Sequence, residues 1–420
     1  MKMKGILSSV SLAVFAVAAR ADVTSVTFAQ DRSRAVTVAY TLDAPAIVTV
    51  DFLTNGVSIG AENFRGVEGD VNRYVDKASG RITWNPLADW PNVKVRDQSF
   101  EARVTAWATN APPDYMAIDL NNEKTVRFYV SEAALPLSVT NDQWKTEWLL
   151  MKRVHAANRV WRMGPNRTAA GSNISVAQSH LVMLTEDYYM GIYMVTRRQY
   201  LLMSKTNEWK PGSHYIGDAL WREPVNAVQM SQIRGTDSTK SAYVWPEAGH
   251  AVADNSICGL LRAHTGIDSF DQPTEAQWEY ACRAGTDTRN YDGTDTTTTL
   301  TNLGWYATSC EAAGDASNNH KLRPVGLKQP NPWGFYDFYG QSFERCLDWY
   351  VKGVYEITAP IMVDPTGPSK GASTSCVSRG GSVDHGTGSL SSDARDAQNE
   401  NGASFYGALR LVCRAALTFK

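Results

Sequence analysis

The stretch FDQPTEAQWEYACRAG, from Phe270 to Gly285, decides the fold of the larger part of this chain. Thr274 is placed to cap a helix, because its hydroxyl can accept a hydrogen bond from a free backbone N–H of the first turn. Glu275 adds negative charge at the positive end of the helix dipole. Ala276, Trp278 or Glu279, and Ala281 or Cys282 lie at helical spacing, so one face can pack against a core. The stretch therefore predicts a short, capped helix with one buried face.

The sequence around this helix has little regular pattern. After Gln143, Trp, Tyr, Gly and Asn become frequent and strand-like runs are short. A second helix is expected at TRRQYLLM, Thr196 to Met203. NPWG, Asn331 to Gly334, is a turn signal, because proline fixes φ and glycine adopts positive φ freely. These features predict a domain built largely from loops, with short helices and strands.

The first part of the chain has a different pattern. Between residues 22 and 122, short β-branched runs such as RAVTVAYTL and AIVTVDFL alternate apolar and polar residues between turn signals. Several strands of this kind predict an antiparallel β-sandwich. Trp84 and Trp90 are expected to pack in or beside its core rather than form a ligand platform. Residues 123–142 are predicted to be a linker, and residues 143–420 a second domain.

The second half resembles the formylglycine-generating enzyme family, also called the sulfatase-modifying-factor domain. The resemblance implies an α+β fold for the whole chain, with the β-sandwich followed by a loop-rich domain related to C-type lectins. The motifs that carry the resemblance occur in the family's order and are WRMG (161–164), DYYMGIYMVTRRQY (187–200), EPVNAVQM (223–230), the quoted stretch, RPVGLKQPNPWGFYDFYGQSFERCLDWY (323–350), RGGS (379–382) and ALRLVC (408–413).

The first residues predict export. Lys2 and Lys4 precede an apolar run from Ile6 to Ala18, and a small-residue cleavage site ends at Ala21, so residues 1–21 are predicted to be a signal peptide. The mature protein is expected in the periplasm or outside the cell. No later segment is apolar and long enough to span a bilayer, so no transmembrane anchor is expected.

The charge of the chain disfavours nucleic acid as a partner. Removal of the signal peptide, with Lys2, Lys4 and Arg20, changes the formal charge from −2 to −5. A weakly acidic chain lacks the basic surface that nucleic-acid binding needs.

The copper site implied by the resemblance is incomplete. Catalytic members of the family oxidise a sulfatase cysteine to formylglycine with Cu(I) and oxygen, and two cysteines after the RGGS serine hold the metal. The matching positions here are His385 and Leu390. Cu(I) is soft and favours thiolates, and leucine offers no ligand atom. Copper is therefore not expected. We predict that the chain is not an enzyme, with catalysis at another site as the alternative.

The alternative to copper chemistry in this loop is nucleophilic catalysis at His385. Asp384 precedes His385, and Ser382, Ser389 and Ser391 lie nearby, which is the composition of a nucleophilic site. Adjacent side chains on an extended segment point to opposite sides, however, so Asp384 is not placed to orient His385. A solvated or carbonyl-bonded histidine is the expected outcome.

The resemblance also implies a structural calcium ion. Its ligands would be Asp337, the carbonyls of Gly340 and Ser342, and Glu344, since calcium prefers carboxylate and carbonyl oxygens. The alternative is that Asp337 serves the turn and Glu344 pairs with an arginine. Part of a second calcium site would fall at Asn302 and the carbonyl of Leu303, with its acid near Ser317 or Asp315.

The six cysteines suggest disulfides, because an exported protein meets an oxidising compartment. The resemblance implies a bridge between Cys258 and Cys413. It places the partner of Cys282 at Ser392, so Cys282 must pair elsewhere or stay free. The pairing of Cys310, Cys346 and Cys376 stays open. No spacing indicates a zinc site.

Three functions remain for the chain. The first is an exported, non-catalytic binding module for a protein or a glycan, in which Trp305-Tyr306 and Trp349-Tyr350 are either contacts or core residues. The second is a formylglycine-generating oxidase, or another enzyme on protein substrates, that uses an unrecognised site. The third is a structural component of the envelope without a selective ligand.

Overall fold

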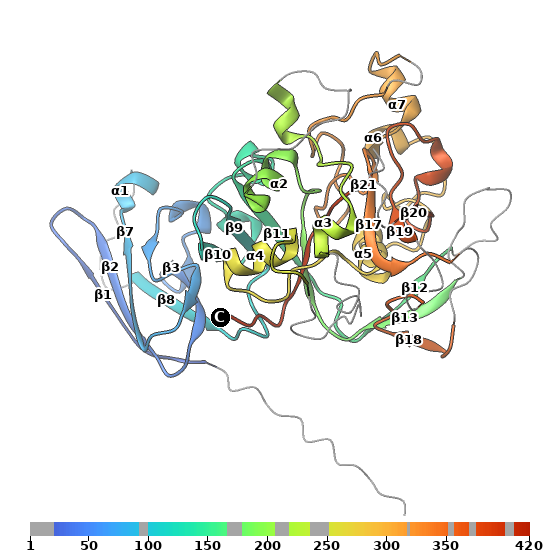
Figure 1. Cartoon of the computed structure of the whole chain (residues 1–420). Coiled ribbons are helices and arrows are strands. Elements are labelled where there is room, and N and C mark those ends of the chain that lie inside the picture. Colours follow the sequence, from blue (N-terminus) through green and yellow to red (C-terminus); the bar gives the residue numbers. More distant parts are fainter. Residues whose placement is uncertain are drawn as a thin grey trace, which may run out of the picture.

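The structure is a computed structural model that describes residues 21–91, 100–165, 179–205, 218–235, 252–316, 320–351, 357–368, 375–399 and 407–420. The predicted signal peptide lies outside these residues, except for Ala21. A β-sandwich forms one end of the molecule, and a larger α+β domain forms the other (Figure 1). Among the described residues, no helix is long and apolar enough to cross a membrane.

The sandwich contains two antiparallel sheets, as predicted. Inward-facing side chains from both sheets, among them Val38, Phe52 and Ile82, share one core. Trp84 is buried in that core and Trp90 packs against it, which confirms their structural role. One sheet has the order β1 (Val23–Gln30), β2 (Val36–Leu42), β7 (Ser79–Trp84), β5 (Glu68–Gly69), and the other contains β4 (Val57–Ser58), β3 (Ala46–Thr54) and β6 (Arg73–Val75), with β8 (Phe100–Trp107) on β3 and a short helix α1 (Pro86–Asp89) beside them.

The domain boundary predicted at residue 122 is wrong. Strand β9 was assigned to the sandwich and β10 to the linker, yet both belong to a sheet of the second domain. Alternating residues identify a strand but do not say which sheet it joins, and β9 finds its partner 29 residues further on, where Asp119 pairs with Trp148. The strand order is β10 (Val126–Tyr129), β9 (Tyr115–Asp119), β11 (Trp148–Val154), β14 (Tyr188–Gly191), β22 (Val412–Arg414).

The other elements of the second domain are short, as its loop-rich pattern predicts. The helices are α2 (Arg197–Ser204), α3 (Met230–Arg234), α4 (Ile257–Thr265), α5 (Glu275–Arg283), α6 (Leu300–Leu303) and α7 (Ala307–Ala312). The remaining strands are β12 (Arg159–Met163), β13 (His180–Leu184), β15 (Gly304–Trp305), β16 (Tyr339–Gly340), β17 (Phe343–Trp349), β18 (Ile361–Val363), β19 (Ser375–Arg379), β20 (Arg395–Asn399) and β21 (Gly407–Ala408).

Helix α5 confirms the predicted cap and corrects the predicted burial. Thr274 and Gln277 form a capping box at its start. Every residue of α5 is buried, not one face alone. Its two acids are neutralised by arginines from the C-terminal strands: Glu275 pairs with Arg379 at 2.9 Å and with Arg395 at 2.8 Å. Buried carboxylates require such partners, because removal from water strongly disfavours an isolated charge.

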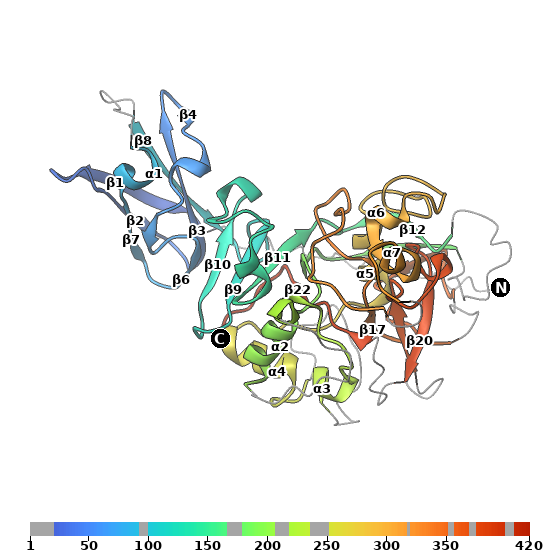
Figure 2. The ribbon, with the colours of Figure 1, turned by 90° about the horizontal axis from the view of Figure 1, so that it is seen from above.

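The two ends of the molecule are in contact. The ring of Phe419, near the C-terminus, stacks on Tyr74 of β6 with centroids 4.1 Å apart. The backbone N–H of Phe128 in β10 donates to the carbonyl of Asn72 at 2.8 Å. Figure 2 shows the same junction from above, with β6 and β10 side by side.

Candidate functional site

The loop that begins with RGGS lies on the turn between β16 and β17. The backbone N–H of Gly340 donates to the carbonyl of Gly380 at 2.8 Å, and that of Val383 donates to Gln341 at 3.1 Å. Gly380 has a φ of 91°, and a Cβ there would lie 2.6 Å from the carbonyl oxygen of Phe338. Only glycine fits this close approach, so the backbone of the loop has a fixed start.

His385 and its neighbour Asp384 have different partners. Nδ1 of His385 lies 2.6 Å from Oγ of Ser382, and the imidazole meets the ring of Phe343 edge to face. Burial lowers the pKa of His385 below its usual value, so the neutral imidazole is favoured. Asp384 instead lies 2.7 Å from Nδ1 of His320. Asp384 therefore contacts another histidine rather than the one beside it.

His320 is a site residue that the sequence did not reveal. It is nearly buried, and its Nε2 lies 3.5 Å from a carboxylate oxygen of Glu311 in α7. Asp384 and Glu311 thus flank one imidazole and connect the RGGS loop to α7. Glu311 and His320 are nine residues apart, but Asp384 lies 64 residues beyond His320, and together they match no local motif, so no sequence signal reveals them.

Leu390 closes the space where a second copper ligand would be needed. Its side chain is fully buried in the main core of the domain. A Cβ at Gly381 would lie 3.1 Å from its Cδ1, so the leucine fills the gap beside the loop. One thiol, Cys310, lies in a small cluster with Val383 and Leu322. Burial raises the pKa of Cys310 to about 11, which disfavours the thiolate.

These residues do not fit a Cu(I) ion. His385 offers one imidazole, whose Nδ1 faces Ser382, and Leu390 offers no ligand atom, so the site lacks the pair of soft sulfur ligands that Cu(I) prefers. Among the described residues, no group of three or more His, Cys, Asp or Glu side chains could hold a metal ion.

Two of the predicted calcium ligands have protein partners in the structure. Both carboxylate oxygens of Glu344 bind Arg410, at 2.7 and 2.8 Å, and one also accepts a hydrogen bond from Trp278. Asp337 accepts the N–H of Gly326 at 2.6 Å, and burial raises its pKa to about 6. Glu344 is therefore the partner of an arginine, and one oxygen of Asp337 serves a turn, whereas its Oδ1 is buried without a hydrogen-bond partner. Calcium binding at this turn stays a prediction.

The other two predicted ligands lie in the same turn, and the residues of the second predicted calcium site also have protein partners. Gly340 and Ser342 are buried, and Oγ of Ser342 has no hydrogen-bond partner. The carbonyl of Asn302 accepts from Gln329, and Asp315 pairs with Arg323 at 2.8 Å. The carbonyl of Leu303 accepts a hydrogen bond from the hydroxyl of Tyr291 at 2.9 Å. Ser317 lies outside the described residues.

No disulfide is present, since all six cysteines are buried free thiols. The predicted bridge between Cys258 and Cys413 is not formed in the structure, where each thiol faces a polar side chain. The Sγ of Cys258 lies 3.9 Å from a carboxylate oxygen of Asp271, and that of Cys413 lies 3.2 Å from the hydroxyl of Ser269. Cys282 contacts Ser392 at 3.7 Å.

The aromatic pairs are mainly structural. Tyr306 and Trp349 are buried. Tyr350 packs partly against the core with the guanidinium of Arg395 over its ring. Trp305 is half-buried at the edge of the site, and Nζ of Lys328 lies 3.7 Å from its ring centroid, a cation–π contact.

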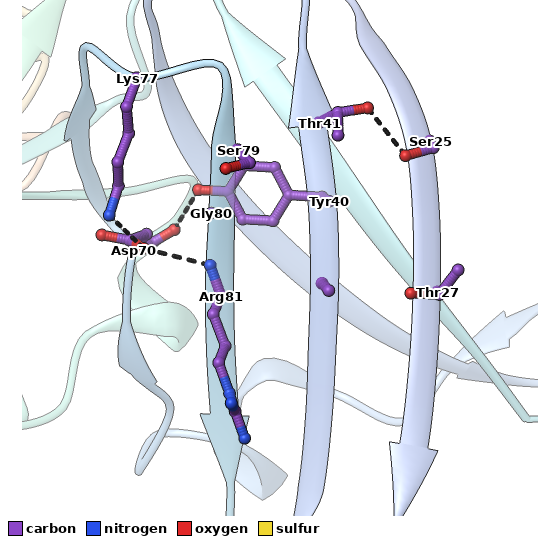
Figure 3. A pocket seen from close by; sticks show the side chains of 10 residues that line it. Ser25, Thr27, Tyr40, Thr41, Asp70, Lys77, Ser79, Gly80 and Arg81 are labelled. Carbon is purple, nitrogen blue, oxygen red and sulfur yellow. Dashed lines mark hydrogen bonds and ion pairs between the residues drawn. The ribbon is translucent and has the colours of Figure 1, made fainter.

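A groove of about 490 Å³ lies on the sandwich, between β1, β2 and β7 (Figure 3). Asp70 organises one side: it pairs with Lys77 at 2.9 Å and accepts the N–H of Arg81 at 3.1 Å. The ring of Tyr40 crosses Gly80, where a Cβ would lie 2.2 Å away, and its hydroxyl donates to the carbonyl of Asp70. The other lining residues are small and mostly hydroxylic, and they are Ser25, Thr27, Ala39, Thr41 and Ser79.

Fold and site together define a loop-rich α+β domain. Pairs of buried charged residues lie beside its RGGS loop, and the loop itself contains no cysteine. A sequence model of the sulfatase-modifying factor enzyme 1-like domain matches residues 157–415, more than half of the chain. The chain belongs to this family, which confirms the resemblance seen in its motifs.

Curated relatives match the chain over part of their length. The formylglycine-generating enzyme of Streptomyces coelicolor is 36% identical over 174 residues, which are 40% of this chain and 48% of that protein. Chaperone protein LppX of Paenibacillus barcinonensis is 25% identical over 182 residues, 39% of this chain and 63% of that protein. The chain thus spans less than two thirds of these relatives.

A solved structure, Treponema denticola variable protein 1, is 22% identical and covers 64% of this chain and 95% of its own, with a TM-score of 0.48.

Proposed function

We propose that the chain is an exported binding protein whose family domain is not catalytic. The observation that carries this proposal is the burial of Leu390 in the core beside Gly381. A soft metal needs two sulfur ligands here, and the position of one is filled by a hydrocarbon side chain. The single nearby thiol, Cys310, cannot supply a pair. Without copper the known oxidation has no route.

The polar groove on the sandwich supports a glycan as the ligand. Its hydroxyls donate and accept hydrogen bonds, and Arg81 and Lys77 add exposed donors. A sugar presents the same mixture of donors and acceptors, so a surface of this composition can match it. The surface around Trp305 and His385 would be a second contact, and a protein is the other ligand class to be tested.

Binding of the chain without residues 1–21 to glycan and peptide arrays tests the proposal. We expect selective retention of a glycan, and an approximately tenfold weaker affinity for Arg81→Ala, because a lost charged hydrogen bond costs about 1.5–3 kcal/mol. Arg103→Ala is the matched control, since Arg103 is an exposed arginine of the same domain that does not line the groove.

Three other outcomes would change the conclusion. Selective peptide binding that Arg81→Ala leaves intact would replace the glycan by a protein ligand at another surface. No selective ligand in either array would contradict the binding function and favour a structural envelope component. Oxidation of a cysteine peptide by the purified chain would contradict the non-catalytic role.

A hydrolase is the second candidate, because Ser382 and His385 lie within 2.6 Å of each other. The side chain of Ser382 is fully buried, and its Oγ lies 3.4 Å from the backbone N–H of Asp384, which is the geometry of a local turn. We therefore expect no labelling by a fluorophosphonate probe. Labelling of the native chain that disappears in Ser382→Ala would favour the hydrolase.

A further inference from the structure

Strand β1 lies at one edge of the sandwich and is not protected against pairing. In the sheet order β1, β2, β7, β5 it comes first, so β2 is its one strand neighbour among the described residues. In Figure 3 the strand that carries Ser25 and Thr27 ends the row. Its sequence, VTSVTFAQ, contains no charged residue and no proline. Since every second residue of an antiparallel strand directs its N–H and C=O away from its neighbour, the free edge of β1 can accept a further strand.

The other edges of the sandwich are protected. β4 and β5 contain two residues each and β6 contains three, so they offer little backbone to a partner. β8 has eight residues, but Glu101 and Arg103 place exposed charged side chains on its solvent face. Short length and charge are devices by which sheets avoid edge-to-edge pairing. Among the described strands of the sandwich, β1 is therefore the long edge that lacks both.

The side of β1 that faces the core of the sandwich is also open. Phe28 pairs with Val38 of β2 and Val26 pairs with Tyr40, so these four side chains lie on the same face of the sheet. Val38 is 0% and Tyr40 2% exposed, whereas Phe28 is 47% and Val26 38% exposed. The ring of Phe28 meets that of Phe100 in β8 edge to face at 5.6 Å, so it does lie over the interior between the sheets. The core is therefore incompletely covered at β1.

These two features specify the same kind of partner. Unpaired N–H and C=O groups along a strand are satisfied best by the backbone of another extended chain, because its groups repeat at the same spacing. Every second side chain of such an added strand would lie on the core-facing side, where apolar residues would cover Val26 and Phe28. The side chains between them would lie beside Ser25 and Thr27 on the outer face, where small polar residues fit.

We propose that β1 is a docking site for an extended segment of a partner protein, which joins the sheet as an additional strand and alternates apolar with small polar residues. This site is distinct from the groove, because Ser25 and Thr27 line the groove on the outer face, whereas Val26 and Phe28 point to the core side. Docking at this edge goes beyond the proposed glycan binding and does not require it.

A fluorescein-labelled peptide with the sequence of β2, VTVAYTL, tests this docking site. The peptide has the required alternation, and in the native sheet its Val38 and Tyr40 already lie opposite Phe28 and Val26. Lysines at both ends keep it soluble, and fluorescence anisotropy measures its binding to the chain without residues 1–21. We expect saturable binding that is lost when Ala39→Pro is introduced into the peptide, because proline in the middle of a strand disrupts the ladder.

A charge placed on the edge of the chain itself gives an independent readout. Val26→Lys should weaken peptide binding at least about tenfold, or about 1.4 kcal/mol, since the added strand would bury an unpaired charge. Val26 is partly exposed, so this variant should still fold, and an unchanged melting temperature checks that. Val57→Lys is the matched control, because Val57 is 69% exposed on β4 of the same sandwich. Bound peptide should slow amide hydrogen exchange in β1 and leave β8 unchanged.

No saturable binding of the peptide, equal binding by Val26→Lys and the native chain, or slowed exchange in β8 instead of β1 would overturn the proposal. So would a dimer of the native chain, seen by sedimentation velocity, that dissociates in Val26→Lys, because a second copy would then occupy the edge. The glycan array and Arg81→Ala report on the groove alone, so either function can fail without the other.

Discussion

The charged framework around Arg379 and the loop that follows Ser382 are adjacent in sequence but differ in how their residues are held. In the framework, Arg379 contacts two acids of α5, and Arg410 binds Glu344 through two hydrogen bonds. All of these side chains are fully buried. In the loop, His385 contacts a serine three residues away.

This difference explains how a family fold persists without the family's metal ligands. A buried charge without its partner is strongly destabilising, so the framework residues depend on one another. His385 has a local contact, so its side chain can be replaced without loss of the fold, whereas Leu390 of the same loop is buried in the main core. The region around RGGS therefore contains buried charged residues that hold the fold and a position, His385, that can change without affecting it.

The framework should show the largest effect on stability. Arg410→Met would leave Glu344 buried without its cation, and we expect a loss of about 3–5 kcal/mol in the free energy of unfolding. Urea unfolding followed by far-UV circular dichroism measures this loss. Arg414→Met is the control, because Arg414 pairs with the partly exposed Glu186 and should cost about 1 kcal/mol or less. Equal losses in the two variants would show that the buried pair of Arg410 and Glu344 matters no more to stability than the partly exposed pair of Arg414 and Glu186.

Two glycines, one beside the framework and one in the loop, should respond differently to substitution by alanine. Gly380→Ala would place a Cβ 2.6 Å from a carbonyl oxygen at a φ of 91°, and we expect a loss of about 1–3 kcal/mol. At Gly386 nothing lies within 4 Å of the added Cβ and φ is −79°, so Gly386→Ala should change stability by no more than about 0.5 kcal/mol. Thermal unfolding of the two variants compares them directly, and the reverse order would contradict the account.

Two histidines should give smaller effects of opposite sign. Asp114 and then Asp187 raise the pKa of His155 to about 9, so its stabilisation is complete below about pH 6.5 and is lost as the pH rises through about 9. His155 is half-exposed, and solvent screening limits its contribution to about 1 kcal/mol. The pKa of His385 is lowered by burial, so its contribution is present above about pH 6.5 and falls as the solution becomes more acidic.

Unfolding of the native chain, His155→Gln and His385→Gln from pH 5 to pH 10 checks these signs. The difference between His155→Gln and the native chain should shrink on the alkaline side, and that for His385→Gln on the acid side. A pH-independent difference for both variants would show that neither imidazole titrates with folding.

The sequence predicts the local structure well and the long-range structure less well. The helix at α2, the capped start of α5 and the alternation in the sandwich depend on neighbouring residues, and the structure has all three. The sheet that β9 joins depends on a partner far along the chain, so the boundary at residue 122 was misplaced. The full burial of α5 could not be predicted from its own residues either, because its acids are neutralised by arginines that lie far along the chain.

The same limit applies to the candidate site. The motif alignment predicts His385 and Leu390 as the positions that matter after RGGS, since spacing within one loop is local. It gives no sign of His320 or Cys310, which reach the site only through the fold. It also assigned Glu344 to calcium, and the role of Glu344 as partner of Arg410 is visible only once β17 and the segment between β21 and β22 are placed.

The most direct test of the central claim is the copper affinity of the purified chain without residues 1–21. Cu(I) is titrated in competition with a chromophoric chelator, and oxygen consumption is then followed with a cysteine-containing peptide. The formylglycine-generating enzyme of Streptomyces coelicolor serves as the positive control. The account predicts no tight copper site and no oxygen consumption above background. One copper ion per chain, with oxygen consumption that is lost in His385→Ala, would contradict it.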